Sequence, residues 1–323
     1  MISTFSLDSQ GLRRAANGID DAVPAGVVWI DLLEPTPEEE KKIEGFLGLE
    51  VPTREEMREI ETSNRLYEEN GALYMTATIV TKLDTDLPES SQVTFILTGN
   101  RLVTNRYVDP LPFRRFIAYA DRHAAQCANG AAVFAGLLES VVNRIADVIE
   151  RVGADLDAVS AEVFTSRRRR GAARDFRHIL ERIGQCGELT SKARETLASL
   201  GRVLSFVQQA TAQPITQDVR GRLRTVSRDV SQMSDHAAFL GNKVQFILDA
   251  TLGMVNIDQN NILKIFSVVT VVLLPPSVIG AIFGMNFDVI PTAHAAWGFA
   301  GALGLMLVSA ILPFVIAKWR GWL

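Results

Sequence analysis

Charged side chains are nearly absent from the C-terminal end of this sequence. The 323-residue chain holds 33 basic and 37 acidic residues, yet only Asp288, Lys318 and Arg320 lie beyond Lys264. The surface of a water-soluble fold is rich in charge, so this end of the chain needs another environment. A uniformly soluble protein is therefore excluded.

Cysteine and histidine are also scarce, and their positions exclude several classes of protein. Cys127 and Cys186 form no CxxC pattern, which rules out a zinc knuckle or a disulfide framework and fits a reducing compartment. The four histidines show no ligand spacing, and the sequence has no phosphate loop or nucleophile–base pair. We therefore expect neither an enzyme nor an organic cofactor. The net charge of −4 argues against nucleic acid as a partner.

The C-terminal part of the sequence, which has few charged residues, contains two long apolar runs. Residues 263–284 and 297–317 are each long enough to cross a bilayer, which takes about 20 apolar residues in a helix. Residues 285–296 would join them as a short loop. The sequence therefore predicts two transmembrane helices at its C-terminal end.

Basic residues flank the two predicted spans on one side only. Lys264 precedes the first span, Lys318 and Arg320 follow the second in the tail 318–323, and the loop between the spans has neither Lys nor Arg. Because basic residues favour the cytoplasmic side, we expect both termini in the cytoplasm and the loop outside. The N-terminus has no apolar stretch of signal-peptide length, so the polar part would stay beneath a bacterial-type inner membrane.

Residues 1–128 mix strand and helix signals and predict a small cytoplasmic α/β domain. VVWIDL at 27–32 predicts a buried strand, and Thr36 with Glu39 predicts a capping box at the start of a helix. Two hairpin signals follow, at Asn70-Gly71 and Gly99-Asn100.

Strand signals vanish from about residue 130, and 129–262 is expected to be a helical stalk region. Apolar residues recur with helical spacing through 131–164, and a second helical segment covers 172–208. No proline occurs between Thr216 and Pro275, so one helix of roughly 100 Å could run through the cytoplasm into the first span.

A run of basic residues, Arg167–Arg170, lies between the first two of these helices. The simplest interpretation is a solvated turn. Contact with anionic lipid headgroups is the alternative.

Polar side chains descend one edge of the third predicted helix into the bilayer. Counting in sevens gives Asp249, Asn256, Leu263, Thr270, Ser277 and Gly284, and the half-heptad positions give Asn260, Ser267 and Leu274. Lipid offers such groups no hydrogen bonds, so they should face water or other helices. Helix–helix contact alone is one interpretation, and a water-filled axis is the other. Two spans cannot enclose a pore, so a pore would need a ring of chains.

Pro275 and Pro276 lie inside the first predicted span and remove two backbone donors. The carbonyl groups of Val271 and Val272 lose their usual partners. In one interpretation these carbonyl groups bind water or a hydrated cation. In the other the helix is kinked, and neighbouring hydroxyl groups donate hydrogen bonds to the two carbonyls.

The string IFSVVTVVLLPPSVIGAIFGMNF, with Asn260 and Lys264 just before it, resembles the first span of CorA-type magnesium transporters. The closing KWRGWL resembles that family's basic tail, and AVPAGVVWIDLLEPTPEEE and SNRLYEENGALYM are similar to its N-terminal domain. The resemblance covers essentially the whole chain. It implies an α+β cytoplasmic domain with an α/β/α sandwich, long stalk helices and two transmembrane helices in a funnel-shaped homopentamer.

The resemblance also assigns roles to residues. Gly284, Met285 and Asn286 match the family's GMN selectivity loop, Leu263 matches a hydrophobic constriction, and the other matches are to pore-facing positions: Asp249, Asn260, Leu274 and Ser277. It implies inward transport of Mg²⁺, often also Co²⁺ and Ni²⁺, gated by Mg²⁺ bound between cytoplasmic domains. No residues are assigned to that regulatory site. Asp288 is the only acidic residue of the outer loop, where the family often has an acidic turn.

Two other functions compete with this prediction. A zinc transporter of the same architecture, coupled to protons, is the nearer one, although Met285 favours magnesium. A non-conducting membrane-tethered scaffold is the other, but a scaffold has no need for polar side chains along one edge of a spanning helix.

Overall fold

The computed structural model describes residues 1–8, 11–14, 26–83, 88–165, 175–210, 213, 215–285 and 296–320. Their contacts divide the chain into two compact units, Met1–Leu248 and Asp249–Leu323. We call these the polar unit and the membrane unit and describe each by itself. The boundary falls inside one helix, and the functional division at residues 128 and 262 stays a prediction.

The polar unit is built on a mixed sheet. Its strands are β1 (Ile2–Leu7), β2 (Leu12–Arg14), β3 (Val27–Leu33), β4 (Leu66–Glu69), β5 (Ala72–Thr81), β6 (Glu89–Thr98) and β7 (Arg101–Arg106). Within the described residues their order is β2-β1-β3-β7-β6-β5-β4. β3 and β7 pair in parallel, whereas the other neighbours are antiparallel.

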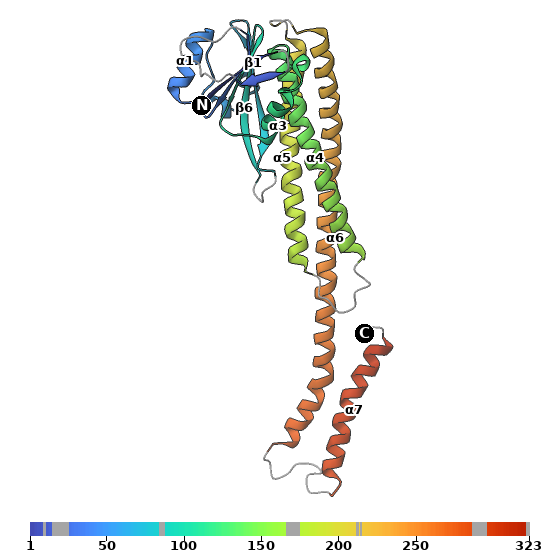
Figure 1. Ribbon diagram of the computed structural model, residues 1–323. Helices are drawn as coiled ribbons and strands as arrows, with labels where there is room; N and C mark the ends of the chain where they lie inside the picture. Colours follow the sequence, from blue (N-terminus) through green and yellow to red (C-terminus); the bar gives the residue numbers. More distant parts are fainter. Residues whose placement is uncertain are drawn as a thin grey trace. The chain divides into compact units, whose positions relative to one another are not determined.

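Helices cover both faces of this sheet (Figure 1). Those of the polar unit are α1 (Pro37–Leu47), α2 (Thr62–Arg65), α3 (Leu111–Ala120), α4 (Gly130–Thr165), α5 (Phe176–Gln209) and the first part of α6 (Gln217–Phe283), with 3-10 turns at Glu56–Arg58 and Ala124–Cys127. α1 lies on one face, and α3, α4 and α5 lie on the other. The predicted α/β/α sandwich is confirmed.

Alternation along β3 explains why both faces are covered. Ile30 and Leu32 pack on one side in a core that includes Ile43 of α1. Trp29 points to the opposite face, because neighbouring residues of a strand alternate. There its ring lies 6.4 Å from that of Phe113 in α3. One strand thus anchors both helical layers.

Two local structures that the sequence predicts are present in this unit. The hydroxyl of Thr36 accepts from the N–H of Glu39, whose carboxylate accepts from the N–H of Thr36, which completes the capping box of α1. Asn70 and Gly71 have positive φ angles of 50° and 76°, as a type I′ turn requires.

The start of α4 is fixed by close backbone contact with β7. The N–H of Gly130 donates to the carbonyl oxygen of Asn100 at 2.8 Å. A Cβ atom at Gly130 would lie 2.2 Å from the carbonyl carbon of Arg101, so only glycine fits there. This contact sets where the helical region leaves the sheet.

Helical spacing predicted α4, a second helical segment was expected over 172–208, and the absence of proline predicted that a third helix continues into the first span. The helices of the described chain agree with these expectations. Most notably, α6 continues through Pro275 and Pro276 to Phe283 as one helix. In the polar unit, the guanidinium of Arg222 on α6 binds Glu139 of α4 at 2.9 and 2.8 Å. The basic run at 167–170 lies outside the described residues.

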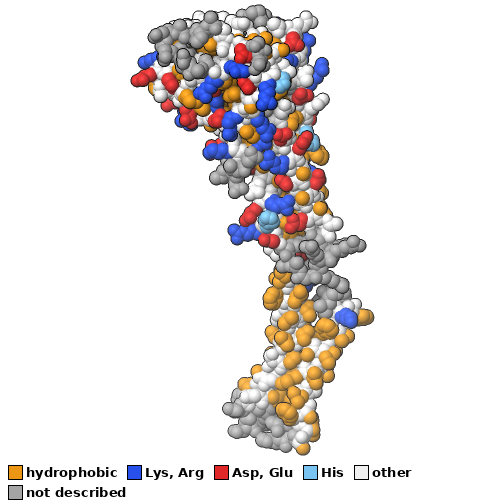
Figure 2. Space-filling view, in the orientation of Figure 1, with side chains coloured by type: hydrophobic (Ala, Val, Ile, Leu, Met, Phe, Trp, Pro, Cys, Tyr) orange, Lys and Arg blue, Asp and Glu red, His pale blue; other side chains and the backbone are white. Residues whose placement is uncertain are grey.

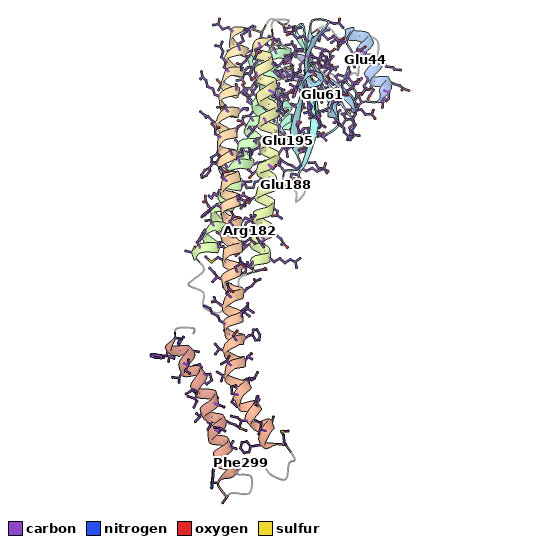
Figure 3. The ribbon with its side chains drawn as sticks, turned by 180° about the vertical axis from the view of Figure 1, so that it is seen from behind. Glu44, Glu61, Arg182, Glu188, Glu195 and Phe299 are labelled. Carbon is purple, nitrogen blue, oxygen red and sulfur yellow. The ribbon has the colours of Figure 1, made fainter. Side chains whose placement is uncertain are left out.

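Polar side chains connect α5 to its neighbours in the polar unit. Figure 3 shows Arg182, Glu188 and Glu195 one after another along it. Arg182 forms an ion pair with Glu162 of α4 at 3.1 Å, and Glu195 accepts from the hydroxyl of Ser90 on β6 at 2.9 Å. α5 therefore contacts both α4 and the sheet.

The membrane unit contains the rest of α6 and α7 (Gly298–Trp319). Both helices are long and apolar enough to cross a bilayer, and their apolar windows are not buried within the chain. Hydrophobic side chains cover the visible surface of these segments (Figure 2). The predicted span 263–284 coincides with the end of α6 and the predicted span 297–317 with α7, and the points at which each helix would enter and leave the bilayer stay predictions.

Candidate ion pathway along α6

All the residues predicted to line a pathway lie on α6, and all are exposed in the single chain: Asp249, Asn256, Asn260, Leu263, Ser267, Thr270, Leu274 and Ser277. Leu263 is 62% exposed and Leu274 is 57% exposed. No other part of the described chain covers this edge of the helix. The side chains of this edge therefore lie on the surface of the single chain.

The edge is not straight. Residues seven apart in an α-helix are rotated by about 20°, so the edge turns by roughly 80° between Asp249 and Ser277. A tilted or supercoiled helix keeps such an edge facing one axis. The seven-residue repeat therefore suits a bundle of inclined helices better than a single upright one.

The hydroxyl groups on this edge share one hydrogen-bond pattern. Ser267, Thr270 and Ser277 each donate to the carbonyl oxygen four residues earlier, at 2.8, 2.8 and 2.7 Å. A hydroxyl has one hydrogen but two lone pairs. Each hydrogen is therefore held by the helix, and the oxygen lone pairs are left over.

These bonds bear on the carbonyl groups freed by the two prolines. Ser277 donates to Leu273, so it does not serve Val271 or Val272. Ser267 and Thr270 donate to earlier carbonyls as well. The interpretation in which these hydroxyls satisfy the freed carbonyls is thus not supported by the described span.

The GMN triplet begins where α6 ends. The N–H of Gly284 donates to the carbonyl of Gly280 at 2.9 Å, which closes the last turn, and Met285 is 49% exposed. Asn286 and Asp288, the other two residues predicted for this end, lie outside the described residues. Their roles stay predictions.

α6 and α7 approach each other closely at one point within the membrane unit. A Cβ atom at Gly280 of α6 would lie 3.1 Å from the methyl carbon of Met306 on α7. Small residues permit such approach between spanning helices. Within the membrane unit, α7 therefore contacts α6 near the end that bears the GMN triplet.

The second span is flanked by indole rings and basic groups. Trp297 and Trp319 are 63% and 87% exposed, as expected of side chains at a membrane interface. Lys318 lies in the last turn of α7, and Arg320 caps its C-terminus. The basic tail thus begins where the apolar helix stops.

No group of three or more His, Cys, Asp or Glu side chains in the described part of the chain is placed to hold a metal ion. The described pathway edge instead offers amides, hydroxyls and one carboxylate, Asp249. These groups suit a cation that keeps its water. The regulatory site remains without assigned residues.

Sequence reasoning missed one exposed feature of α6. Phe239 and Phe246 in the polar unit are 58% and 61% exposed, although large apolar rings are usually buried. Phe246 is only partly covered by Phe164 of α4, with ring centroids 6.0 Å apart. The two residues are seven apart, so the same count in sevens would have found them.

Together these features define a class. It comprises proteins with two candidate membrane spans in which one continuous helix with an exposed polar edge leads from an α/β domain into the first span.

Comparison with known proteins identifies the family within that class. The sequence model described as CorA-like Mg²⁺ transporter protein matches residues 24–318. This chain belongs to the CorA-like Mg²⁺ transporter family, as its resemblance implied. Members of that family transport ions and are not enzymes.

Relatives match over their full length. Magnesium transport protein CorA of Pasteurella multocida is 32% identical over 327 residues, and that of Haemophilus influenzae is 31% identical over 324, each with 100% of both chains covered. The Escherichia coli K12 protein is 29% identical over 324 residues, again with both chains covered in full.

Solved structures share the fold. The complete CorA magnesium transporter from Methanocaldococcus jannaschii aligns with a TM-score of 0.75 at 18% identity, covering 100% of this chain and 99% of that one. The full-length CmaX protein aligns with a TM-score of 0.72 at 16% identity, covering 99% and 97%.

Proposed function

We propose that this chain carries Mg²⁺ into the cytoplasm across a bacterial inner membrane, as one subunit of a homopentamer. Relatives that match over their whole length are magnesium transport proteins. The observation that carries the proposal is the exposed polar edge of α6, which continues from Asp249 through an apolar helix to Ser277. Lys264, Lys318 and Arg320 support cytoplasmic termini by the positive-inside rule.

The exposed edge supports assembly. Polar groups facing lipid are costly, and two spans cannot surround a path, so several copies of α6 must share one axis. Exposed Phe239 and Phe246 give the same helix an apolar surface for such contacts outside the membrane. Burial of these rings would favour assembly by about 25 cal/mol for each Å² removed from water.

Selection would take place at the outer end of α6. Mg²⁺ gives up its water reluctantly, and a ring of Asn286 amides can hydrogen-bond that water without removing it. A neutral ring also avoids binding a divalent ion too tightly to release it. Leu263 and Leu274, both exposed on the same edge, would close the path by excluding water.

The membrane potential would drive the ion inward. A potential of 100 mV contributes about 2.3 kcal/mol for each elementary charge, and roughly twice that for Mg²⁺. No coupling ion is then needed. We include Co²⁺ and Ni²⁺ as further cargo, and cytoplasmic Mg²⁺ bound between neighbouring subunits as the gating ligand.

Ion flux into liposomes that hold the purified protein tests this proposal. We expect Mg²⁺ uptake that needs no proton gradient and is abolished by Asn286→Ala. Asn143→Ala, which changes an exposed asparagine of α4, is the matched control and should leave flux unchanged. Mass measurement in detergent should give five copies of the chain.

Other outcomes would overturn it. Zinc flux that follows a proton gradient, with no Mg²⁺ flux, would assign the chain to the proton-coupled alternative. A stable monomer that passes no cation would support the scaffold instead.

A further inference from the structure

Ile60 presents an apolar side chain at the surface of the polar unit. It is 90% exposed, which is the highest value among the large apolar side chains of the described residues, those of the two candidate spans included. Side chains of this kind are usually buried in a folded domain. A single exposed isoleucine is not unusual on a monomer, so the surroundings of Ile60 decide what it can do.

The backbone on both sides of Ile60 is fixed by hydrogen bonds. On one side, the guanidinium of Arg65 donates to the carbonyl oxygen of Glu59. On the other, the N–H of Asn64 donates to the carbonyl oxygen of Glu61 at 3.2 Å. The isoleucine is therefore held on the surface by its own neighbours along the chain.

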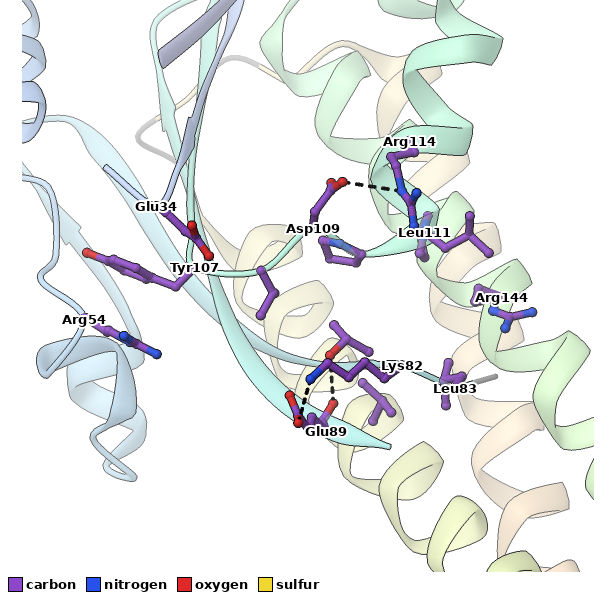
Figure 4. A pocket seen from close by; sticks show the side chains of 15 residues that line it. Glu34, Arg54, Lys82, Leu83, Glu89, Tyr107, Asp109, Leu111, Arg114 and Arg144 are labelled. Carbon is purple, nitrogen blue, oxygen red and sulfur yellow. Dashed lines mark hydrogen bonds and ion pairs between the residues drawn. The ribbon is translucent and has the colours of Figure 1, made fainter. Parts of the chain in front are cut away.

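The surface around Ile60 is acidic. Residues 55–61 carry four carboxylates and one cation, Arg58. Arg54, the next cation along the chain, stacks on the ring of Tyr107 at 5.2 Å from the centroid (Figure 4). A cavity of about 540 Å³ adjoins Ile60, and its described lining has no Lys or Arg but four glutamates: Glu44, Glu50, Glu56 and Glu59.

The first turns of α6 carry the opposite charge. Arg220, Arg224 and Arg228 follow one another at intervals of four residues, so they lie along one ridge of the helix. All three are exposed, and none forms an ion pair within the described chain. Residues 217–232 hold four arginines and two aspartates, and among the described residues only Arg222 is paired, with Glu139 at 2.8 Å.

This part of α6 also offers a place for an apolar side chain. Four residues at the spacing i, i+3, i+4 and i+7 enclose a hole on a helix surface, into which a side chain of another element can insert. Gly221, Arg224, Thr225 and Arg228 have this spacing. The space that a Cβ atom of Gly221 would occupy is open, and the aliphatic stems of the two arginines can flank an apolar group.

The two surfaces are complementary but do not meet within one chain. Ile60 is almost fully exposed, and neither Glu59 nor Glu61 pairs with an arginine of α6 in the described chain. Because the two surfaces differ, a contact between copies would use one surface of each, and every copy would still have the other surface to offer. Contacts of this heterologous kind generate a ring when the rotation between copies closes.

We propose that Ile60 of one copy inserts into the hole at Gly221 of the next copy, and that the two glutamates beside it pair with Arg224 and Arg228. The proposal rests on the homopentamer proposed above and names one of its subunit contacts. The apolar side chain would supply the centre of this contact. Ion pairs at the rim contribute little energy when exposed, but they fix the register between partners and exclude wrong ones.

Disulfide cross-linking of the full-length protein in liposomes tests the contact. Ile60→Cys with Thr225→Cys should give, under mild oxidation, covalent species of two to five chains on a non-reducing gel. The native cysteines are buried and can stay in place. Ile60→Cys with Ser231→Cys is the matched control, because Ser231 is exposed on the same helix but lies about 120° around it from Thr225. The control should give no covalent oligomer.

Charge reversal in the Ile60→Cys, Thr225→Cys protein tests the ion pairs. Arg224→Glu with Arg228→Glu should lower the yield of cross-linked chains by at least about tenfold, because like charges would then face each other across the contact. Adding Glu59→Lys with Glu61→Lys should restore most of the yield. Adding Glu150→Lys with Asp155→Lys changes the charge equally at exposed positions of α4 and should not restore it.

Several outcomes would overturn the proposal. These are equal cross-linking of both cysteine pairs, no cross-link between positions 60 and 225, and equal recovery with the two sets of added lysines. Mass measurement of the same samples separates this contact from the proposed function. A particle of five chains without the cross-link would overturn the contact alone, whereas a monomer would overturn both.

Discussion

The backbone N–H of Thr78 donates a hydrogen bond of 2.9 Å to the side-chain oxygen of Ser199, which joins strand β5 to helix α5. The N–H of Val80 makes the equivalent bond to Thr196 at 3.2 Å. β4 pairs only with Ala72–Met75, so it leaves the rest of the β5 edge uncovered. Two hydroxyl groups of α5 thus replace the missing strand, which protects an edge that could otherwise pair with another chain.

Ser199→Ala should therefore lower the free energy of unfolding by about 1–3 kcal/mol, because the buried N–H of Thr78 loses its partner. The measurement is denaturant unfolding of the purified protein, followed by tryptophan fluorescence. Ser191→Ala changes an exposed serine of the same helix and should have little effect. Equal effects of the two substitutions would contradict this role of Ser199.

Asp31 and Arg106 form an ion pair in which both side chains are only 4% exposed. The carboxylate accepts from the guanidinium at 2.9 and 2.7 Å and from the hydroxyl of Thr104 at 2.7 Å. Burial lowers the pKa of Arg106, but its hydrogen bonds to Asp31 and Asp109 outweigh burial and raise that pKa overall. The guanidinium thus stays charged inside the fold.

Asp31→Ala should destabilise the protein by about 3–5 kcal/mol, because it leaves a buried charge without its main partner. Glu181→Ala removes an exposed ion pair with Arg177 and should change stability by about 0.5 kcal/mol or less. Thermal unfolding followed by fluorescence suits this comparison, since buried Trp29 donates to Thr104 in the same network. Similar melting temperatures for the two variants would disprove the assignment.

The thiol of Cys127 is fully buried, and burial raises its pKa to about 11 from an ordinary value of 9.0. The thiolate is the reactive form, so we expect almost no reaction with a disulfide reagent at pH 8 until the protein unfolds. Between about pH 9 and 11 the unfolded chain loses this proton first, so stability should fall as pH rises through that window. Cys127→Ala should make the decrease in stability smaller. Rapid labelling of Cys127 in the native protein would show that the thiol is accessible.

The proposed constriction at Leu263 can be tested through its polarity. Leu263→Asn should raise Mg²⁺ flux into liposomes several-fold, because a hydrated constriction no longer excludes water. Ile265 is equally exposed at 63% but lies about 200° around the helix, so Ile265→Asn should not raise flux. An increase with both variants would indicate a general leak and not a constriction at Leu263.

The sequence predicted the features that depend on neighbours along the chain. The capping box at Thr36, the hairpin at Asn70-Gly71 and the long helix that runs from about residue 216 into the first span all follow from local chemistry. The parallel pairing of β3 with β7 was not predicted, because hydrophobic alternation does not specify which strand pairs with which.

Long-range polar contacts were missed for the same reason. Nothing near Ser199 in the sequence shows that its oxygen meets Thr78, which is 121 residues away. The ion pair of Asp31 with Arg106 spans 75 residues. The role of Asn286 came from family resemblance and stays a prediction, since that residue lies outside the described chain.

The inward hydrogen bonds of Ser267, Thr270 and Ser277 have an electrostatic consequence. Because the three hydroxyl hydrogens are bound within their own helix, these three side chains would present only oxygen lone pairs toward an axis shared by several subunits. These oxygen atoms would accept hydrogen bonds from the water molecules around a cation and would repel chloride. Discrimination by sign of charge would then arise within the bilayer without any ionised side chain at these three positions.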